Sequence, residues 1–413
     1  MSFSQLGLSS PVQKALKHRG FTQPTPIQKE VIPLVLAKHD IIVRAETGSG
    51  KSASFILPIL ELWLKQVGEG KAKIKVLVLT PTRELTIQIA DAFSTFGVFL
   101  DRKPKVLSII GGESIGNQLY DIQQGCDILV ATSGRLLDIV TKKQMNLSHL
   151  DFFVLDEADR MLDLGFSEEL DLILKELPLK RQNLLFSATY PPKMQLIASK
   201  ITKDPLHISS SGKEVAVQSI LQRAILVNRE NRGPLLRYLL GSEKWEQALV
   251  FMANRRSADN IAQKFKKYGF LADSLHGDLL QEERIFTLER FRAKKINILF
   301  ATDIAARGLD IDGISCVVNF DLPRSPLDYI HRIGRTGRAG RDGVAVSFIG
   351  HEDKEHFSLI EKRSGVKLER EQIAGFELSG ETPIKEQGKE PIKGKGKSKK
   401  DKARELAAKA SVN

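Results

Sequence analysis

Short apolar runs recur along the first half of the chain, separated by polar or amphipathic stretches. The runs lie at residues 41–43, 75–80, 106–110, 127–131, 152–156 and 183–187. Runs that are apolar at nearly every position are typical of strands buried on both faces, and the stretches between them have helical length. We therefore predict a parallel sheet covered by helices on both faces. In such sheets, ligands bind beyond the carboxyl ends of the strands.

The same alternation returns in the second half, at residues 248–252, 270–274, 296–301, 316–320 and 344–349. Because 413 residues exceed the size of one compact core, we predict two α/β domains at 1–208 and 218–375, joined by a linker at 209–217. Residues 376–413 contain few apolar positions and many lysines, so we expect a basic, disordered tail. The tail either holds nucleic acid electrostatically or keeps the protein in solution.

Two helices are expected before the first strand. One begins after Ser9 and ends at Gly20, and the other spans residues 28–36, after a turn stiffened by two prolines. Gln28 stands just upstream of a glycine-rich segment. Its amide can both donate to and accept from the edge of an adenine.

That glycine-rich segment, residues 44–52, joins the first predicted strand to a helical stretch. Its glycines let backbone N–H groups point inward, and the start of the helix adds partial positive charge, as phosphate binding requires. Lys51 is placed to reach the β- and γ-phosphates, and the Ser52 hydroxyl is placed to ligate Mg²⁺. Ala45 stands where the strict pattern has glycine. An ordinary flexible loop is therefore the alternative.

Two carboxylates, Asp156 and Glu157, close the apolar run at 152–156. Asp156 is suited to hold the waters around Mg²⁺, and Glu157 is suited to orient and deprotonate an attacking water. A solvated acidic turn that caps the next helix is the alternative. Ser187 and Thr189 end the following run and bring two hydroxyls beside these carboxylates.

The second half has no phosphate loop but contains an arginine-rich segment at 331–341. Its guanidinium groups would pair with the phosphates of a nucleotide held by the first domain, although a basic surface loop explains them equally well. Residues 301–310 follow another predicted strand and mix hydroxyl, carboxylate and glycine positions. They are suited to contact a ribose or a phosphate backbone.

The formal net charge of +12 favours a polyanionic partner, either nucleic acid or an anionic membrane surface, although a solvated basic tail also contributes to it. The two cysteines, Cys126 and Cys316, have no metal-ligand spacing and indicate a reduced compartment. No apolar run is long enough to cross a bilayer, and residues 1–10 lack the pattern of a signal peptide. We expect a cytoplasmic protein that has no membrane partner.

Together these segments resemble the motifs of the DEAD-box ATP-dependent RNA helicases of superfamily 2. Residues 156–159 spell the sequence that names the family. Its other motifs follow in order at 20–28 (Q), 45–52 (I), 81–85 (Ia), 111–112 (GG), 132–135 (Ib), 187–189 (III), around 251 (IV), 301–310 (V) and 331–338 (VI). The resemblance covers residues 3 to about 349 and implies two tandem RecA-like domains that bind ATP, Mg²⁺ and RNA. The short basic tail points to the bacterial RhlE-like group.

The resemblance also implies roles for the residues at matching positions. Catalysis would involve Lys51, Asp156, Glu157, Arg335 and Arg338. Nucleotide binding would involve Phe3, Phe21, Gln28, Thr47, Gly48, Ser49, Gly50, Lys51, Ser52, Gly308 and Asp310. Coupling of the ATP state to domain closure would involve Asp159, Ser187, Thr189 and His331. Contacts to the RNA backbone would come from Arg83, Gly112, Thr132, Arg135 and Thr302. Mg²⁺ would be held, largely through water, by Ser52 and Asp156.

Three positions depart from the usual motifs of the family. Ser52 replaces the usual threonine and keeps the hydroxyl, whereas Ser133 replaces a proline and makes the Ib loop less rigid. Residues 252–254 differ from the usual wording of motif IV, so no site residue is assigned there.

The resemblance implies that ATP and single-stranded RNA together close the two domains. Closure would open a short duplex locally and without processive tracking, or would remodel an RNA–protein complex. An ATP-controlled RNA clamp or assembly scaffold with little unwinding is the main alternative, and a DNA helicase is a lesser one. We expect a monomer that binds single-stranded and short duplex RNA without reading its sequence, with ribosomal or RNA-decay complexes as candidate partners.

Overall fold

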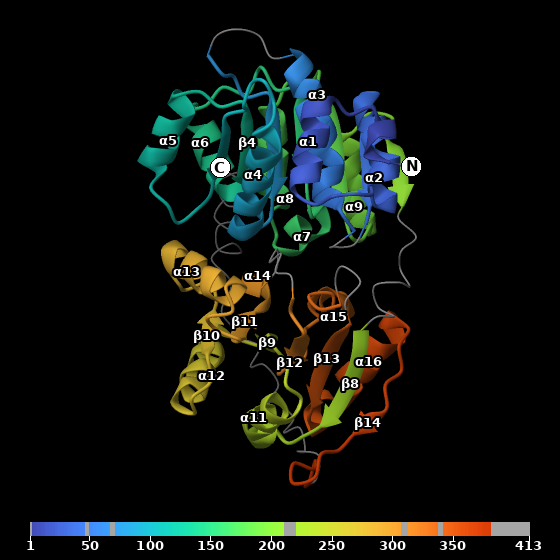
Figure 1. The fold of residues 1–413 in the computed structure, drawn as a ribbon, viewed down its shortest axis with the longest axis vertical. Helices are drawn as coiled ribbons and strands as arrows, with labels where there is room; N and C mark the ends of the chain where they lie inside the picture. Colours follow the sequence, from blue (N-terminus) through green and yellow to red (C-terminus); the bar gives the residue numbers. More distant parts are fainter. Residues whose placement is uncertain are drawn as a thin grey trace, which may run out of the picture.

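The computed structural model describes residues 2–45, 49–66, 71–209, 220–306, 313–337 and 342–380. These residues form two lobes, each built on a seven-stranded sheet (Figure 1). Every hydrogen-bonded strand pair in both sheets is parallel, so the predicted α/β class is confirmed. Across these described ranges, none of the helices combines the length and the apolar character needed to span a bilayer.

The first sheet has the strand order β3-β4-β2-β5-β6-β1-β7. Its strands are β1 (Ile41–Arg44), β2 (Val76–Thr80), β3 (Val106–Ile109), β4 (Ile128–Thr132), β5 (Phe152–Leu155), β6 (Gln182–Ser187) and β7 (Leu206–Ser209). Because parallel strands need long crossovers, helices connect most of them. The helices are η1 (Phe3–Leu6), α1 (Ser10–His18), α2 (Pro26–Leu36), α3 (Lys51–Gln66), α4 (Arg83–Gly97), α5 (Ile115–Gln123), α6 (Ser133–Thr141), α7 (Ala158–Asp163), α8 (Ser167–Lys175) and α9 (Pro192–Ile201).

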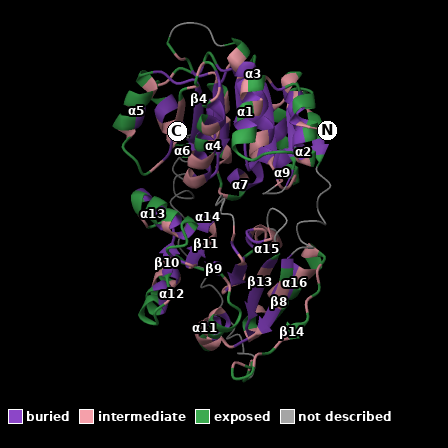
Figure 2. Ribbon diagram, viewed as in Figure 1, coloured by how far each residue is buried: buried purple, intermediate pink, exposed green. Residues whose placement is uncertain are grey.

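Successive residues of the central strands face opposite layers of helices. In β2, Val76 and Val78 belong to the hydrophobic cluster formed with η1 and α1 to α4. Leu77 and Leu79 belong to the cluster formed with α5 to α9. Figure 2 shows the central strands of this lobe buried between the two layers. Burial on both faces explains why the central strands are apolar at nearly every position.

The second sheet has the order β10-β11-β9-β12-β13-β8-β14. Its strands are β8 (Ile220–Leu226), β9 (Ala248–Met252), β10 (Ala272–Leu275), β11 (Ile298–Thr302), β12 (Cys316–Asn319), β13 (Gly343–Ile349) and β14 (Arg370–Glu371). Its helices are η2 (Arg229–Asn231), α11 (Arg232–Ser242), α12 (Arg255–Lys267), α13 (Gln281–Arg292), α14 (Asp303–Ala306), α15 (Pro326–Ile333), η3 (His351–Asp353) and α16 (Lys354–Ser364). Three hydrophobic clusters pack the α-helices of this domain against the sheet.

Some predicted boundaries differ from those observed. The second helix begins at Pro26 rather than at residue 28, because the Thr25 hydroxyl accepts the N–H of Gln28 and caps the helix earlier. The predicted linker at 209–217 lies, beyond its first residue, outside the described residues. Phe376, assigned to the tail, packs on Tyr238 with ring centroids 5.7 Å apart. The rest of the tail, from residue 381 on, lies outside the described residues.

The Asp40 side chain joins three segments at the edge of the first sheet where β1 and β6 begin. One carboxylate oxygen accepts the N–H of Asn183 at 2.8 Å. The other accepts the Asn183 side-chain amide at 2.9 Å and the N–H of Lys203 at 2.9 Å. This carboxylate therefore accepts hydrogen bonds from two backbone N–H groups, those of Asn183 and Lys203.

Replacing Asp40 by alanine should leave those donors unsatisfied and destabilise the first domain by about 1–3 kcal/mol. Urea unfolding of the full chain measures the effect as an earlier transition. Asp40→Asn keeps one acceptor oxygen and should lose less, while Asp138→Ala removes only an exposed pair with Lys142 and should change little. An Asp40→Ala variant that unfolds at the wild-type midpoint would contradict this assignment.

Candidate functional site

The carboxyl ends of the first sheet's strands lie along one edge because the strands are parallel and in register. Arg44 at the end of β1 pairs with Ser187 at the end of β6. Thr80 at the end of β2 pairs with Thr132 at the end of β4, and β5 lies between β2 and β6. The segments that follow these strands therefore meet, as the sequence predicted. They carry most of the first domain's predicted site residues.

The phosphate-loop segment is described at Ala45 and again from Ser49 onward, whereas Thr47 and Gly48 lie outside the described residues. Lys51 and Ser52 begin helix α3. Lys51 is only 7% exposed, and no group in the described part of the chain hydrogen-bonds its ammonium nitrogen. A buried, unpartnered ammonium at the start of a helix fits an anionic ligand such as a phosphate.

Gln28 connects the Q segment to the phosphate loop. Its side-chain oxygen accepts the N–H of Thr25 at 3.0 Å, and its side-chain nitrogen donates to the Gly50 carbonyl at 3.2 Å. Gly50 has φ of +90°, and a Cβ there would lie 2.6 Å from the Gln28 nitrogen. Glycine is therefore required at this position both by conformation and by contact.

The two aromatic residues predicted to help bind the nucleotide lie in different environments. Phe3 is 6% exposed and belongs to the hydrophobic cluster of the first domain. Phe21 is 38% exposed and packs on Phe96 with ring centroids 6.1 Å apart. Phe21 is thus accessible to a flat ligand, whereas Phe3 is in position to support the site through packing.

The carboxylates Asp156 and Glu157 follow β5 and are almost fully buried. Burial raises the pKa of Asp156 to about 6, although the nearby Lys51 charge opposes the rise. Burial also acts to raise the pKa of Glu157, but the charges of Arg160, Lys51 and Arg335 outweigh it and hold that pKa at about 2. Glu157 is therefore ionised at neutral pH.

The backbone at Glu157 lies in the left-handed region, with φ of 48°. Residues other than glycine seldom adopt this conformation, and Glu157 is the only predicted site residue among the described non-glycine residues that do. This conformation places Glu157 at the start of α7, where its carboxylate pairs with the Arg160 guanidinium. The turn thus fixes the direction of the carboxylate predicted to activate water.

Three of the four residues predicted to couple the ATP state to domain closure form one hydrogen-bonded group. One Asp159 carboxylate oxygen accepts both the N–H and the hydroxyl of Thr189, each at 2.8 Å. The Ser187 hydroxyl accepts the N–H of Asp159 at 3.3 Å and donates to the Thr189 carbonyl at 2.6 Å. The fourth residue, His331, comes from α15 of the second domain. Burial lowers its pKa to about 4 although Asp159 opposes this, so the ring is neutral.

The second domain places an arginine within reach of the first domain's carboxylates. Arg335 is 5% exposed, its Nε donates to the His331 carbonyl at 3.2 Å, and its charge contributes to lowering the pKa of Glu157. Predicted residues Arg338, Gly308 and Asp310 lie outside the described residues.

Arg332 belongs to the same arginine-rich segment but makes its contacts inside the second domain. It is 3% exposed and makes a bidentate pair with Asp303 at 2.6 and 2.7 Å. It also donates to Asn319 at 3.0 Å and lies 4.7 Å from the Phe251 ring centroid. The sequence pattern did not distinguish this internal arginine from those that face a ligand.

The residues predicted to contact RNA form two groups. Arg83 lies against Gly112, where φ is +87° and a Cβ would come within 2.4 Å of the guanidinium. Arg135 donates at 3.0 Å both to the Gln118 side chain and to the Glu113 carbonyl, beside Gly112. Thr132 ends β4 next to Arg135, and Thr302 ends β11 in the other domain. Arg83, Gly112 and Arg135 thus lie close together and are held by contacts within the protein.

A buried ion pair across the two domains was missed by the sequence analysis. Arg284 of α13 donates to one carboxylate oxygen of Glu84 at 2.8 and 2.6 Å, and both side chains are at most 8% exposed. Beside it, Arg83 donates to Gln281 at 3.4 Å. Charged residues on helices usually indicate a solvated face, and the partners lie 200 residues apart in the chain, so no local signal pairs them.

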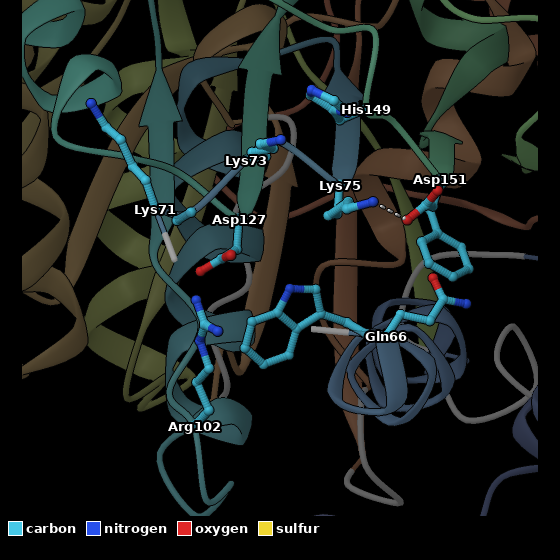
Figure 3. A pocket seen from close by; sticks show the side chains of 11 residues that line it. Gln66, Lys71, Lys73, Lys75, Arg102, Asp127, His149 and Asp151 are labelled. Carbon is cyan, nitrogen blue, oxygen red and sulfur yellow. Dashed lines mark ion pairs between the residues drawn. The ribbon is translucent and has the colours of Figure 1, made fainter. Parts of the chain in front are cut away.

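A cavity of about 230 Å³ opens at the opposite edge of the first sheet and contains no predicted site residue. Figure 3 shows the charged side chains around it. Lys75 pairs with Asp151 at 3.0 Å, and Asp127 accepts the N–H of Lys105 at 2.9 Å. Helix α3 ends here, and cations balance the partial negative charge of a helix C-terminus. These charges are explained without a ligand.

Solved structures with known ligands match both domains together. S. cerevisiae Dbp5 bound to RNA and ADP BeF3 matches with a TM-score of 0.78 and 32% identity, over 90% of this chain and 95% of that one. Mss116p bound to single-stranded RNA and AMP-PNP matches with a TM-score of 0.81 and 27% identity, over 90% and 78% of the two chains. The fold is therefore that of two tandem RecA-like domains, the class that the sequence implied.

Sequence comparison gives the family. Residues 25–197 match the DEAD/DEAH box helicase family, and residues 232–340 match the helicase conserved C-terminal domain. The DEAD-box ATP-dependent RNA helicase CshA of Bacillus licheniformis is 40% identical over 370 residues, which are 90% of this chain and 75% of that protein. The chain belongs to the DEAD-box ATP-dependent RNA helicases, a family of RNA-dependent ATPases. CshA of Bacillus subtilis is also similar, with 39% identity over 370 residues. Because both relatives are CshA proteins, the predicted RhlE-like subgroup is not confirmed.

Removing the interdomain ion pair should weaken the contact between the two domains. Arg284→Ala would leave Glu84 buried and uncompensated, and breaking a buried pair in this way costs about 3–5 kcal/mol. We expect the RNA concentration that gives half-maximal ATPase to rise at least tenfold, which corresponds to about 1.4 kcal/mol. This is less than the full cost of breaking the pair, because an RNA titration reports the contact between the domains only indirectly.

The exposed pair of Lys294 and Glu246 provides the matched control, because Lys294→Ala removes a cation of the same domain at little cost. A double variant that exchanges the two charges, Glu84→Arg with Arg284→Glu, should need less RNA for half-maximal ATPase than Arg284→Ala does. An Arg284→Ala enzyme with an unchanged RNA titration would show that the ion pair does not contribute to closure.

Proposed function

We propose that this protein is an RNA-gated ATPase that separates short RNA duplexes locally or remodels RNA–protein complexes. ATP and single-stranded RNA would together draw the two domains into the arrangement described here. Arg335 of the second domain carries this proposal, because its charge reaches Glu157 of the first. The hydrolysis site is therefore complete only when the two domains meet.

The described residues fit ATP and Mg²⁺. The unpartnered Lys51 ammonium and the backbone around Gly50 would hold phosphates, with Thr47, Gly48 and Ser49 completing the loop. Ser52 and the buried Asp156 would hold Mg²⁺ largely through water, and the metal would neutralise phosphate charge. Gln28 and Phe21 would contact the base, with Phe3 packing behind, and Gly308 and Asp310 would contact the ribose.

Glu157 is proposed to orient the attacking water and to accept its proton. Its carboxylate is ionised and its direction is fixed by Arg160, so it can accept a hydrogen bond from the attacking water. Arg335 and Arg338 would stabilise the charge that develops on the transferred phosphoryl group. The group formed by Asp159, Ser187 and Thr189, facing His331, would relay the ATP state to the position of the second domain.

Contacts of Arg83, Gly112, Thr132, Arg135 and Thr302 with the sugar-phosphate backbone would hold the RNA. Backbone contacts fix position but carry no sequence information, so we propose binding without sequence preference. We further propose a monomeric, cytoplasmic protein that works with ribosomal or RNA-decay complexes. An ATP-controlled RNA clamp with little unwinding remains the second candidate, since it would use the same residues.

The ATPase rate measured with single-stranded RNA, duplex RNA, DNA or no nucleic acid tests this function. We expect strong stimulation by RNA and little by DNA. Equal rates with and without RNA would refute gating, and stimulation by DNA would favour a DNA helicase. A duplex-release assay then separates the two RNA candidates, because ATPase without strand release would indicate a clamp.

Glu157→Gln should abolish turnover while ATP and RNA binding persist. The amide keeps the shape of the side chain but cannot accept the proton, and loss of a general base lowers rates about 10²- to 10⁴-fold. Steady-state ATPase and fluorescence binding of labelled RNA with AMP-PNP measure the two effects separately. Unchanged turnover would remove Glu157 from the catalytic role.

A further inference from the structure

A histidine and an aspartate of the second domain form a pair that the proposed chemistry does not use. His276 follows β10 and is 3% exposed, while Asp259 projects from α12. Nε2 of His276 lies 2.7 Å from a carboxylate oxygen of Asp259. The Ser274 hydroxyl donates to the same oxygen and holds it in place.

The hydrogen bonds of His276 indicate which ring nitrogen donates and which accepts. The N–H of Asp278 donates to Nδ1 at 3.3 Å, so Nδ1 carries no proton and acts as an acceptor. The proton therefore lies on Nε2, which donates it to Asp259. Because both nitrogens are engaged, the plane of the ring is fixed. The hydrogen bonds of the His276 ring therefore fix the loop that leads from β10 to α13.

That loop supplies one of the two anchors of Arg284. The carbonyl oxygen of His276 accepts from Nη1 of Arg284 at 2.8 Å. Nε and Nη2 of the same guanidinium donate to Glu84 of the first domain at 2.8 and 2.6 Å. A guanidinium is planar and rigid, so a displaced His276 carbonyl would turn the other donors away from Glu84.

We propose that Asp259 and His276 are positioning residues for domain closure. They hold the loop after β10 in the arrangement that directs Arg284 at Glu84, although neither makes a hydrogen bond or ion pair with the other domain among the described residues. The inference rests on the proposed function, because it concerns the closure that ATP and RNA bring about. A role limited to the stability of the second domain is the competing explanation.

RNA affinity of the full chain, measured by fluorescence anisotropy with labelled single-stranded RNA, tests the proposal. Asp259 is 40% exposed, so its truncation should be tolerated. We expect Asp259→Ala to weaken RNA binding about tenfold with AMP-PNP present, within the usual range of coupling between contacting residues, and to leave nucleotide-free binding unchanged. Equal RNA affinity of the variant and the wild type with AMP-PNP would overturn the proposal.

Two replacements of His276 provide a matched comparison. Glutamine places an N–H near the position of Nε2, so it can still donate to Asp259. Asparagine reaches only the position of Nδ1 and loses that contact. We therefore expect His276→Gln to bind RNA with AMP-PNP more tightly than His276→Asn does, and the reverse order would contradict the assigned hydrogen bonds.

A double-mutant cycle with Glu84→Ala separates positioning from stability. If Asp259 acts through the Arg284–Glu84 pair, the double variant should bind RNA with AMP-PNP no more weakly than Glu84→Ala alone. Additive losses would overturn positioning in favour of the stability role. Lys294→Ala serves as the control and should match the wild type. If the wild type itself binds RNA equally with and without AMP-PNP, the proposed function fails instead, so the two failures are distinguishable.

Discussion

The structure depends on burying charged groups from both domains in one place. Lys51, Asp156, Glu157 and Arg160 of the first domain are at most 8% exposed, and Arg335 of the second is 5% exposed beside them. An isolated buried charge is costly, so these groups are tolerated only as partners of one another or of a ligand. The depressed pKa of Glu157 and the unpartnered ammonium of Lys51 are two consequences of this arrangement. Neither domain contains the complete set.

Much of the fold that brings these groups together could be predicted from the sequence. The apolar strands can be recognised locally, and their parallel arrangement follows from the helices between them. Strands buried on both faces are apolar at nearly every position, so each predicted strand lies within two residues of an observed one. Parallel register then brings the segments after β1, β2, β5 and β6 to one edge. The edge strands β7 and β14 escaped prediction because the first is largely exposed and the second has only two residues. Strand β8 also escaped, because its polar and partly exposed positions break the apolar run. A strand that does not face a core on both sides has no continuous apolar signal.

What the sequence could not give are contacts between distant charged residues. The pattern of 331–341 suggested one group of phosphate-binding arginines. Arg332, however, hydrogen-bonds to Asp303 and Asn319 inside its own domain. Glu84 and Arg284 look like ordinary surface charges until the two domains are placed together. Propensity and periodicity describe what a residue does within its own element. They carry no information about which element of another domain it will meet.

The positions of the two interdomain contacts have a consequence for coupling. Arg335 acts at the carboxylates of the predicted hydrolysis site, whereas Arg284 binds Glu84 next to Arg83, a predicted RNA contact. Both arginines belong to one domain with its own packed sheet, so a single movement must satisfy both contacts. A ligand that stabilises either contact therefore favours the other. Because such coupling is reciprocal in free energy, ATP should tighten RNA binding by the factor by which RNA tightens ATP binding. A site divided between two domains thus links its ligands without requiring contact between them.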